Sequence, residues 1–183
     1  MLAPEREPGA PLETTAGALF DSVATRLPTR ARRMLELAAA FHAAARAAGD
    51  EHADRAGRDM ALAAPITGLS ADEQAIIASA VAFQREKLRS TREPAFLWLG
   101  EKEQRTALRL AAILRVAGVI DAHAAGLLLV HGDESAVTLI IGGEQAAQVI
   151  ADVEMQAQLW RGDAKFTLDF AIEPAVTAPP LAR

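Results

Sequence analysis

The stretch 106–123, TALRLAAILRVAGVIDAH, constrains the fold more than any other part of the chain. Its apolar residues recur at helical spacing so densely that little of the helix surface is left for polar side chains. One narrow polar face remains, made of Arg105, Arg109 and Asp121. We therefore expect a central helix that is packed on several sides. Two of its residues are unusual, because Arg115 lies inside the apolar run and Gly118 lies near its end.

Composition favours one mostly helical domain, with room for a small appendage. The chain has 183 residues, of which 51% are hydrophobic, and alanine supplies much of this fraction. A formal net charge of −5 gives no general attraction to nucleic acid, polyphosphate or an anionic membrane, so only a local basic patch could bind such ligands. The absence of cysteine excludes disulfides and thiolate chemistry. With no visible secretion signal or membrane-spanning run, we expect a cytoplasmic protein.

The spacing of apolar residues in the rest of the chain changes near residue 125, from a mainly helical pattern to one that includes strands. Before this point, helical spacing predicts four more helices, which run from a cap at Thr14 or Thr15 to Leu27, from Arg30 to Ala48, from Glu51 to Ala64 and from Ala71 to Leu88. The start of the last helix is the clearest local signal, because Ser70 and Glu73 form a capping box. After this point, the pattern predicts strands at 127–131 and 137–141, a helix at 144–160 and a strand at 165–172.

These elements predict an α+β protein, with a mainly helical bundle followed by a small ββαβ subdomain. We expect a flexible leader at 1–13, because this segment is rich in proline, glycine and alternating charges. The helical domain then occupies 14–125 and the ββαβ subdomain 126–173. We expect a loose tail at the proline-rich residues 174–183.

Local motifs do not specify a reaction. None of the four histidines (His42, His52, His123 and His131) has the short spacing of a metal motif such as HExxH. The chain also lacks a glycine-rich phosphate loop and a GxSxG nucleophile elbow. A single histidine in a helical protein is more often packed or solvated than a ligand, and we interpret His131 in its turn in this way.

The order of several segments is more informative than any one of them. The segments are LFD at 19–21, LELAAAFH at 35–42, TGLSADEQAIIA at 67–78, VAFQREK at 81–87 and LRLAAILRVAGVIDAH at 108–123. In this order they resemble the C-terminal, HD-like half of the exopolyphosphatase/guanosine pentaphosphate phosphatase (Ppx/GppA) family, over Thr14 to Ile172. The resemblance implies an HD-domain-like fold for 14–125. It also implies that catalysis belongs to a pair of actin-like domains, which this chain has no room to contain.

The resemblance also implies descent from metal-dependent phosphohydrolases, in which a histidine, a His-Asp pair and a distant aspartate hold metal. Here the pair is His42-Ala43, the next ligand position is Gln84-Arg85, and Gly118 stands where the last aspartate is expected. Divalent ions such as Mg²⁺ prefer carboxylate oxygens, and both aspartates are missing. We therefore predict no catalytic residues, no metal site and no cofactor. The missing ligands favour a protein that is not an enzyme.

The residues left at these positions are candidates for binding a ligand or an anion. They are His42, His52, Arg85, Arg115, Asp121 and His123. Arg115 has two interpretations: a structural role, paired with a carboxylate such as Glu73 or Asp121, or an anion contact together with Arg85 and His42. We favour the structural role. A second basic cluster at the end of the fourth helix comprises Lys87, Arg89 and Arg92, which also complement the helix C-terminus.

The leading hypothesis is a non-catalytic binding or regulatory module. Its expected partner is a phosphate-rich small molecule or polyphosphate, a partner protein, or a second copy of the chain, and neither DNA nor a membrane. One alternative is an HD-type phosphohydrolase that holds a divalent metal in a rearranged site of His42, His52, Asp121 and His123. Another is a structural partner of a separately encoded actin-like phosphatase domain.

Overall fold

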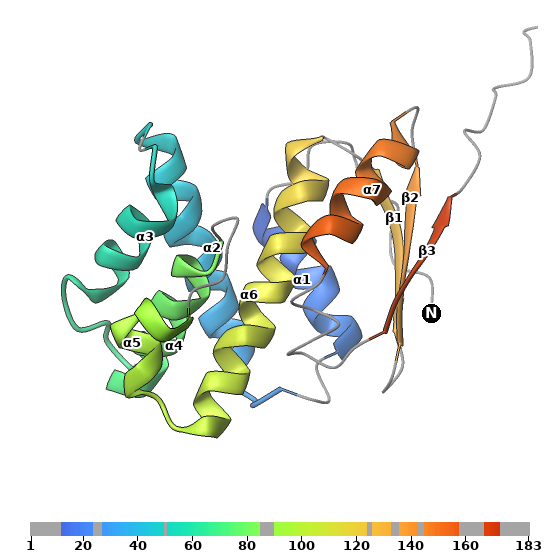
Figure 1. The fold of residues 1–183 in the computed structure, drawn as a ribbon. Helices are drawn as coiled ribbons and strands as arrows, with labels where there is room; N and C mark the ends of the chain where they lie inside the picture. The colour runs from blue at the N-terminus through green and yellow to red at the C-terminus, as the bar shows by residue number, and fades with distance from the viewer. Residues whose placement is uncertain are drawn as a thin grey trace, which may run out of the picture.

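The computed structural model describes residues 12–23, 27–49, 51–84, 90–123, 126–132, 136–142, 145–157 and 167–172 (Figure 1). Its helices are α1 (Leu12–Val23), α2 (Ala31–Ala47), α3 (Ala53–Leu62), α4 (Ala71–Ala82), the 3-10 helix η2 (Ser90–Arg92), α5 (Pro94–Trp98), α6 (Glu101–Ala122) and α7 (Ala146–Gln156). Its strands are β1 (Gly126–Gly132), β2 (Ala136–Gly142) and β3 (Thr167–Ile172). The prediction of a mainly helical chain is confirmed. Most of the predicted leader and the whole predicted tail lie outside the described residues.

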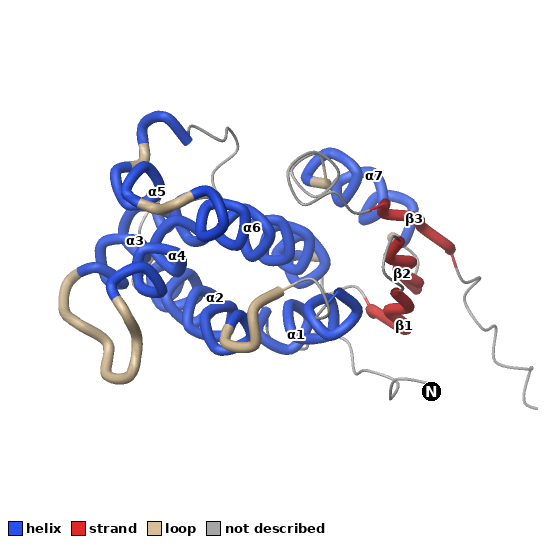
Figure 2. Tube along the Cα trace, turned by 90° about the horizontal axis from the view of Figure 1, so that it is seen from below, coloured by secondary structure: helices blue, strands red, loops and turns tan. Residues whose placement is uncertain are grey.

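Helix α6 is the centre of the fold, as its dense apolar pattern predicts. Figures 1 and 2 show it between α2 and α4 on one side and α7 and the sheet on the other. It contacts α1, α2, α4, α5 and α7. Leu110 and Ile113 are both 0% exposed, and so is Ala117 on a further turn. Burial on several sides leaves this helix little surface for solvent, which fixes the positions of the helices around it.

Helix α4 begins where the capping box predicts but ends earlier than expected. The Ser70 hydroxyl accepts a hydrogen bond from the Glu73 backbone N–H at 3.2 Å, and the Glu73 carboxylate accepts one from the Ser70 N–H at 2.8 Å. The predicted end at Leu88 is wrong, because α4 ends at Ala82. The next residue, Phe83, is buried edge-on against Phe96 at a ring distance of 5.1 Å. The C-cap residue of α4 is thus held in the core by a contact that is distant in sequence.

The first two helices also differ slightly from the predicted bounds. Helix α1 begins at Leu12 rather than near Thr14, and the Leu12 side chain is buried in the core. Helix α2 ends as predicted just before Gly49, which has a φ of 73°. This left-handed conformation favours glycine and terminates helices.

The three strands form one sheet in the order β1-β2-β3. β1 and β2 are antiparallel and β3 runs parallel to β2. Helix α7, which lies between β2 and β3 in sequence, packs against both strands and against α6. Buried residues of this region, such as Ile141 and Val149, belong to the same hydrophobic cluster as the helical bundle. A separate ββαβ subdomain is therefore not supported, because α7 buries its apolar face on both the sheet and the bundle.

Among the described residues, no helix combines the length and the apolar character that crossing a membrane requires.

Candidate functional site

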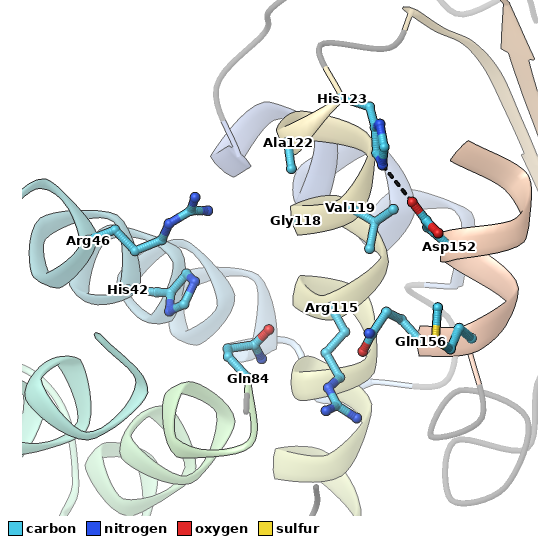
Figure 3. A pocket seen from close by; sticks show the side chains of 11 residues that line it. His42, Arg46, Gln84, Arg115, Gly118, Val119, Ala122, His123, Asp152 and Gln156 are labelled. Atoms are coloured by element: carbon cyan, nitrogen blue, oxygen red, sulfur yellow. Dashed lines mark hydrogen bonds and ion pairs between the residues drawn. The ribbon is translucent and has the colours of Figure 1, made fainter. Parts of the chain in front are cut away.

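A groove runs along α6 between α2 and α7 (Figure 3). Its volume is about 430 Å³. We call it the α6 groove and define it by its polar lining residues, which are His42, Arg46, Gln84, Arg115, His123, Asp152 and Gln156. They come from α2, α4, α6 and α7 or the residues that directly follow these helices, so only the tertiary structure brings them together.

Small residues on α6 leave space for the groove. Gly118 and Ala122 lie on the same face of the helix as Arg115, because residues three or four apart in an α-helix share a face. All three line the groove. A Cβ atom added at Gly118 would meet no other atom within 4 Å. The position at which the family resemblance expects an aspartate is therefore open space on the groove floor.

The α2 wall of the groove carries basic side chains. His42 and Arg46 are four residues apart and both extend from α2 toward α6 (Figure 3). The His42 Nδ1 atom is buried and has no hydrogen-bond partner within the described part of the chain. Burial lowers the pKa of His42 below its ordinary value, Arg46 lowers it further, and Asp54 acts in the opposite direction. The ring is therefore predominantly neutral at neutral pH and has a nitrogen available for a ligand.

Arg115 places a second guanidinium in the same groove. Its side chain is half-buried, and this burial lowers the pKa of the guanidinium. An arginine nevertheless stays protonated in proteins, so the groove contains a partly dehydrated cation. Charges interact more strongly where water is partly excluded, which favours an anion beside Arg115.

The α7 wall is different, because it holds a carboxylate. Asp152 accepts hydrogen bonds from two side chains: His123 Nε2 lies 2.8 Å from its Oδ2 atom, and Gln148 Nε2 donates to its Oδ1 atom at 3.0 Å. The bond to His123 connects the end of α6 to α7 (Figure 3). Asp152 is the only carboxylate among the described residues that line the groove. Asp152 therefore adds one negative charge to the groove, while Arg46 and Arg115 add two positive charges.

The structure assembles half of the six predicted ligand-binding residues. His42, Arg115 and His123 line the α6 groove. His52 and Asp121 do not line it: His52 is the exposed N-cap residue of α3, and Asp121 is half-buried on α6. The sixth, Arg85, lies outside the described residues.

The second predicted cluster is described only in part. Lys87 and Arg89 lie outside the described residues, whereas Arg92 is exposed in η2. Glu73, one of the carboxylates expected beside Arg115, binds Arg30 at 2.9 Å.

Sequence reasoning missed Arg46, Asp152 and Gln156. Arg46 could have been found from its spacing, since it lies one helical turn after His42. The two α7 residues carry no local signal. Asp152 meets His123 across 29 residues of sequence, and nothing near it in the chain predicts this contact.

A second pocket of about 460 Å³ lies where α2, α4 and α6 begin. We call it the α4-cap pocket, and its charged lining residues are Arg30, Asp72, Glu73, Lys102 and Glu103. Arg30 pairs with Glu73 and also donates a hydrogen bond to the carbonyl oxygen of Gly68. Carboxylates outnumber cations here, and the arginine is already occupied by the protein itself.

The α6 groove does not have the donor set of a divalent metal site. Its one described carboxylate, Asp152, is shared by His123 and Gln148, and two guanidinium groups lie in the same groove. Divalent ions prefer several oxygen ligands, and nearby cations repel them. The described ranges contain no group of three or more His, Asp or Glu side chains that could hold a metal ion.

Neither a protein-family model nor a curated protein matches this chain.

Proposed function

We propose that this protein is a non-catalytic binding module that takes a phosphate-bearing ligand in the α6 groove. The observation that carries this proposal is that Arg46, Arg115 and His42, which come from two helices, line one groove. Guanidinium groups match phosphate oxygens in geometry as well as in charge, and a buried histidine nitrogen adds a neutral hydrogen-bonding group. The net charge of −5 does not oppose such local binding, because two arginines line the groove beside a single described carboxylate.

The proposal includes a relation to the HD-like domain of Ppx/GppA phosphatases. The order of the sequence segments supports this relation. So does the position of Gly118, which faces the same groove as His42 although the two residues are distant in sequence. In this interpretation, an ancestral metal site lost its carboxylates and kept a pocket with positive charge.

Calorimetric titration with inorganic phosphate and with tripolyphosphate tests the proposal. Charged hydrogen bonds contribute roughly 1.5–3 kcal/mol, so we expect Arg115→Gln to weaken binding about 10- to 100-fold. The matched control is Arg30→Gln in the α4-cap pocket, which removes the same charge and should leave binding unchanged. If neither anion binds, or if the two variants lose the same amount of affinity, the proposal is refuted.

A turnover assay separates binding from catalysis. Phosphomonoester, nucleotide and polyphosphate substrates would be incubated with the protein in the presence of Mg²⁺ or Mn²⁺. We expect no turnover. Activity that His42→Ala abolishes and Arg30→Gln preserves would establish a phosphohydrolase instead. Stable association with a separately expressed actin-like phosphatase domain, without anion binding, would favour the structural-partner alternative.

A further inference from the structure

The two walls of the α6 groove differ in chemistry, and this difference restricts the ligand. The α2 wall presents His42 and Arg46, whereas the α7 wall presents Asp152, Gln156 and the apolar Met155 (Figure 3). Arg115 lies on α6 between the two walls. A ligand that occupies the groove therefore meets positive charge at one side and a carboxylate with an amide at the other.

The size of the groove indicates more than an isolated inorganic anion. Its volume of about 430 Å³ lies within the range of roughly 300–1,000 Å³ that is typical of small-molecule sites. A single phosphate would leave most of this space to water. The ligand that fills the groove has an additional part, which must suit the α7 wall.

Asp152 disfavours a second phosphate at that wall. A carboxylate offers about four acceptor positions. The two described bonds, from His123 and Gln148, leave acceptor capacity for a ligand. A linear polyphosphate would bring negative charge close to this carboxylate, and like charges repel at short range. Hydroxyl groups would instead donate hydrogen bonds to Asp152 and to the amide oxygen of Gln156.

We propose that the α6 groove binds the phosphomonoester of a small polyhydroxy compound, a sugar phosphate in chemical class. Its phosphate lies against Arg115, with Arg46 adding positive charge from the α2 wall, and its hydroxyl groups lie against Asp152 and Gln156. This inference rests on the proposed function and adds the chemical class of the ligand. It excludes a polyphosphate chain as the preferred ligand.

Titration of the full chain with four probes at fixed ionic strength tests the inference. Ribose 5-phosphate and glucose 6-phosphate carry hydroxyls, methyl phosphate carries none, and tripolyphosphate carries additional charge. We expect at least one sugar phosphate to bind about tenfold more tightly than methyl phosphate, and also more tightly than tripolyphosphate. If methyl phosphate binds as tightly as both sugar phosphates, or tripolyphosphate binds most tightly of all, the inference is wrong.

Substitutions in the α7 wall test whether this wall causes the preference for a sugar phosphate. Asp152→Asn removes the charge, so tripolyphosphate affinity should rise several-fold while the advantage of the sugar phosphate over methyl phosphate shrinks. Asp121→Asn is the matched control, because Asp121 does not line the groove. This substitution should change neither the affinity for tripolyphosphate nor the advantage of the sugar phosphate over methyl phosphate. Gln156→Leu leaves the bond between His123 and Asp152 intact and tests the wall independently if Asp152→Asn unfolds.

The outcomes distinguish this inference from the function on which it rests. Binding of methyl phosphate that depends on Arg115 but shows no preference for hydroxyl groups refutes the sugar phosphate and leaves the phosphate module standing. Failure of all four probes to bind refutes both.

Discussion

The α6 groove and the α4-cap pocket have almost the same volume, about 430 and 460 Å³, and each contains arginine. They differ in the number and the bonding of the carboxylates around the arginine side chains. In the α4-cap pocket, Glu73 and the Gly68 carbonyl bind Arg30. In the α6 groove, Arg46 and Arg115 share the lining with a single described carboxylate, Asp152, which His123 binds. An arginine in a pocket is therefore not sufficient for an anion site; the balance of charge around it decides.

The two pockets also differ in how they are built. The α4-cap pocket contains the capping box of Ser70 and Glu73, whose bonds span three residues and stabilise the start of a helix. The α6 groove contains residues of several helices and has open space above Gly118. The first arrangement serves the fold, whereas the second contains the buried His42 Nδ1 atom, which has no hydrogen-bond partner among the described residues.

The largest expected effect comes from filling the groove. Gly118→Leu would place a branched side chain in the open space on the groove floor, so we expect phosphate binding to fall below detection in calorimetry. Gly118→Ala is the control, since its methyl group meets no other atom within 4 Å. It should preserve binding and stabilise the protein by roughly 0.5–1 kcal/mol, because alanine favours a helix over glycine. Unchanged binding in Gly118→Leu would place the anion site elsewhere.

A smaller loss is expected for Arg46→Gln. The Arg46 side chain is more exposed than that of Arg115, so solvent screens its charge more strongly. We expect a several-fold decrease in phosphate affinity and a weaker dependence of affinity on salt concentration. The measurement is a titration at several NaCl concentrations, compared with Arg115→Gln. A loss larger than that of Arg115→Gln would contradict the proposed arrangement.

The protonation of His42 should give the groove a pH dependence that the α4-cap pocket lacks. Burial is the first cause of the lowered pKa, so the unfolded chain takes up a proton at higher pH than the folded chain. The contribution of His42 to stability is therefore complete above its ordinary pKa of 6.5 and decreases as the pH falls through the lowered value. Sulfate in the groove should favour the protonated ring, so its affinity should rise as the pH falls below 6.5.

Thermal unfolding at several pH values, with and without sulfate, measures both effects. His42→Gln should weaken the dependence of stability and of sulfate affinity on pH. His52→Gln should retain both, because His52 is exposed outside the groove. Equal profiles for the two variants would show that His42 does not titrate in contact with the anion.

The smallest effect on binding is expected in the α4-cap pocket. Ser70→Ala removes the side-chain acceptor of the capping box and should cost about 1 kcal/mol of stability. Phosphate affinity should stay the same, because the loss affects only the start of α4. Denaturant unfolding gives the change in stability and calorimetry gives the affinity. A marked loss of affinity would mean that the two pockets are coupled through α4.

The sequence alone determined the local features of this protein. The apolar density of α6 predicted a central helix, Ser70 and Glu73 marked the start of α4, and Gly49 marked the end of α2. Each of these signals acts within a few residues, through helical periodicity or a capping hydrogen bond, and so can be recognised without a structure.

Only the tertiary structure decided which residues share a site. Phe83, the C-cap residue of α4, packs against Phe96, and α7 brings Asp152 to His123 across 29 residues of sequence. The sequence singled out Arg115 and Gly118, but the structure showed that they face one groove and joined Arg46 to them. Packing between helices depends on surfaces that are distant along the chain, and no local pattern encodes which of these surfaces meet.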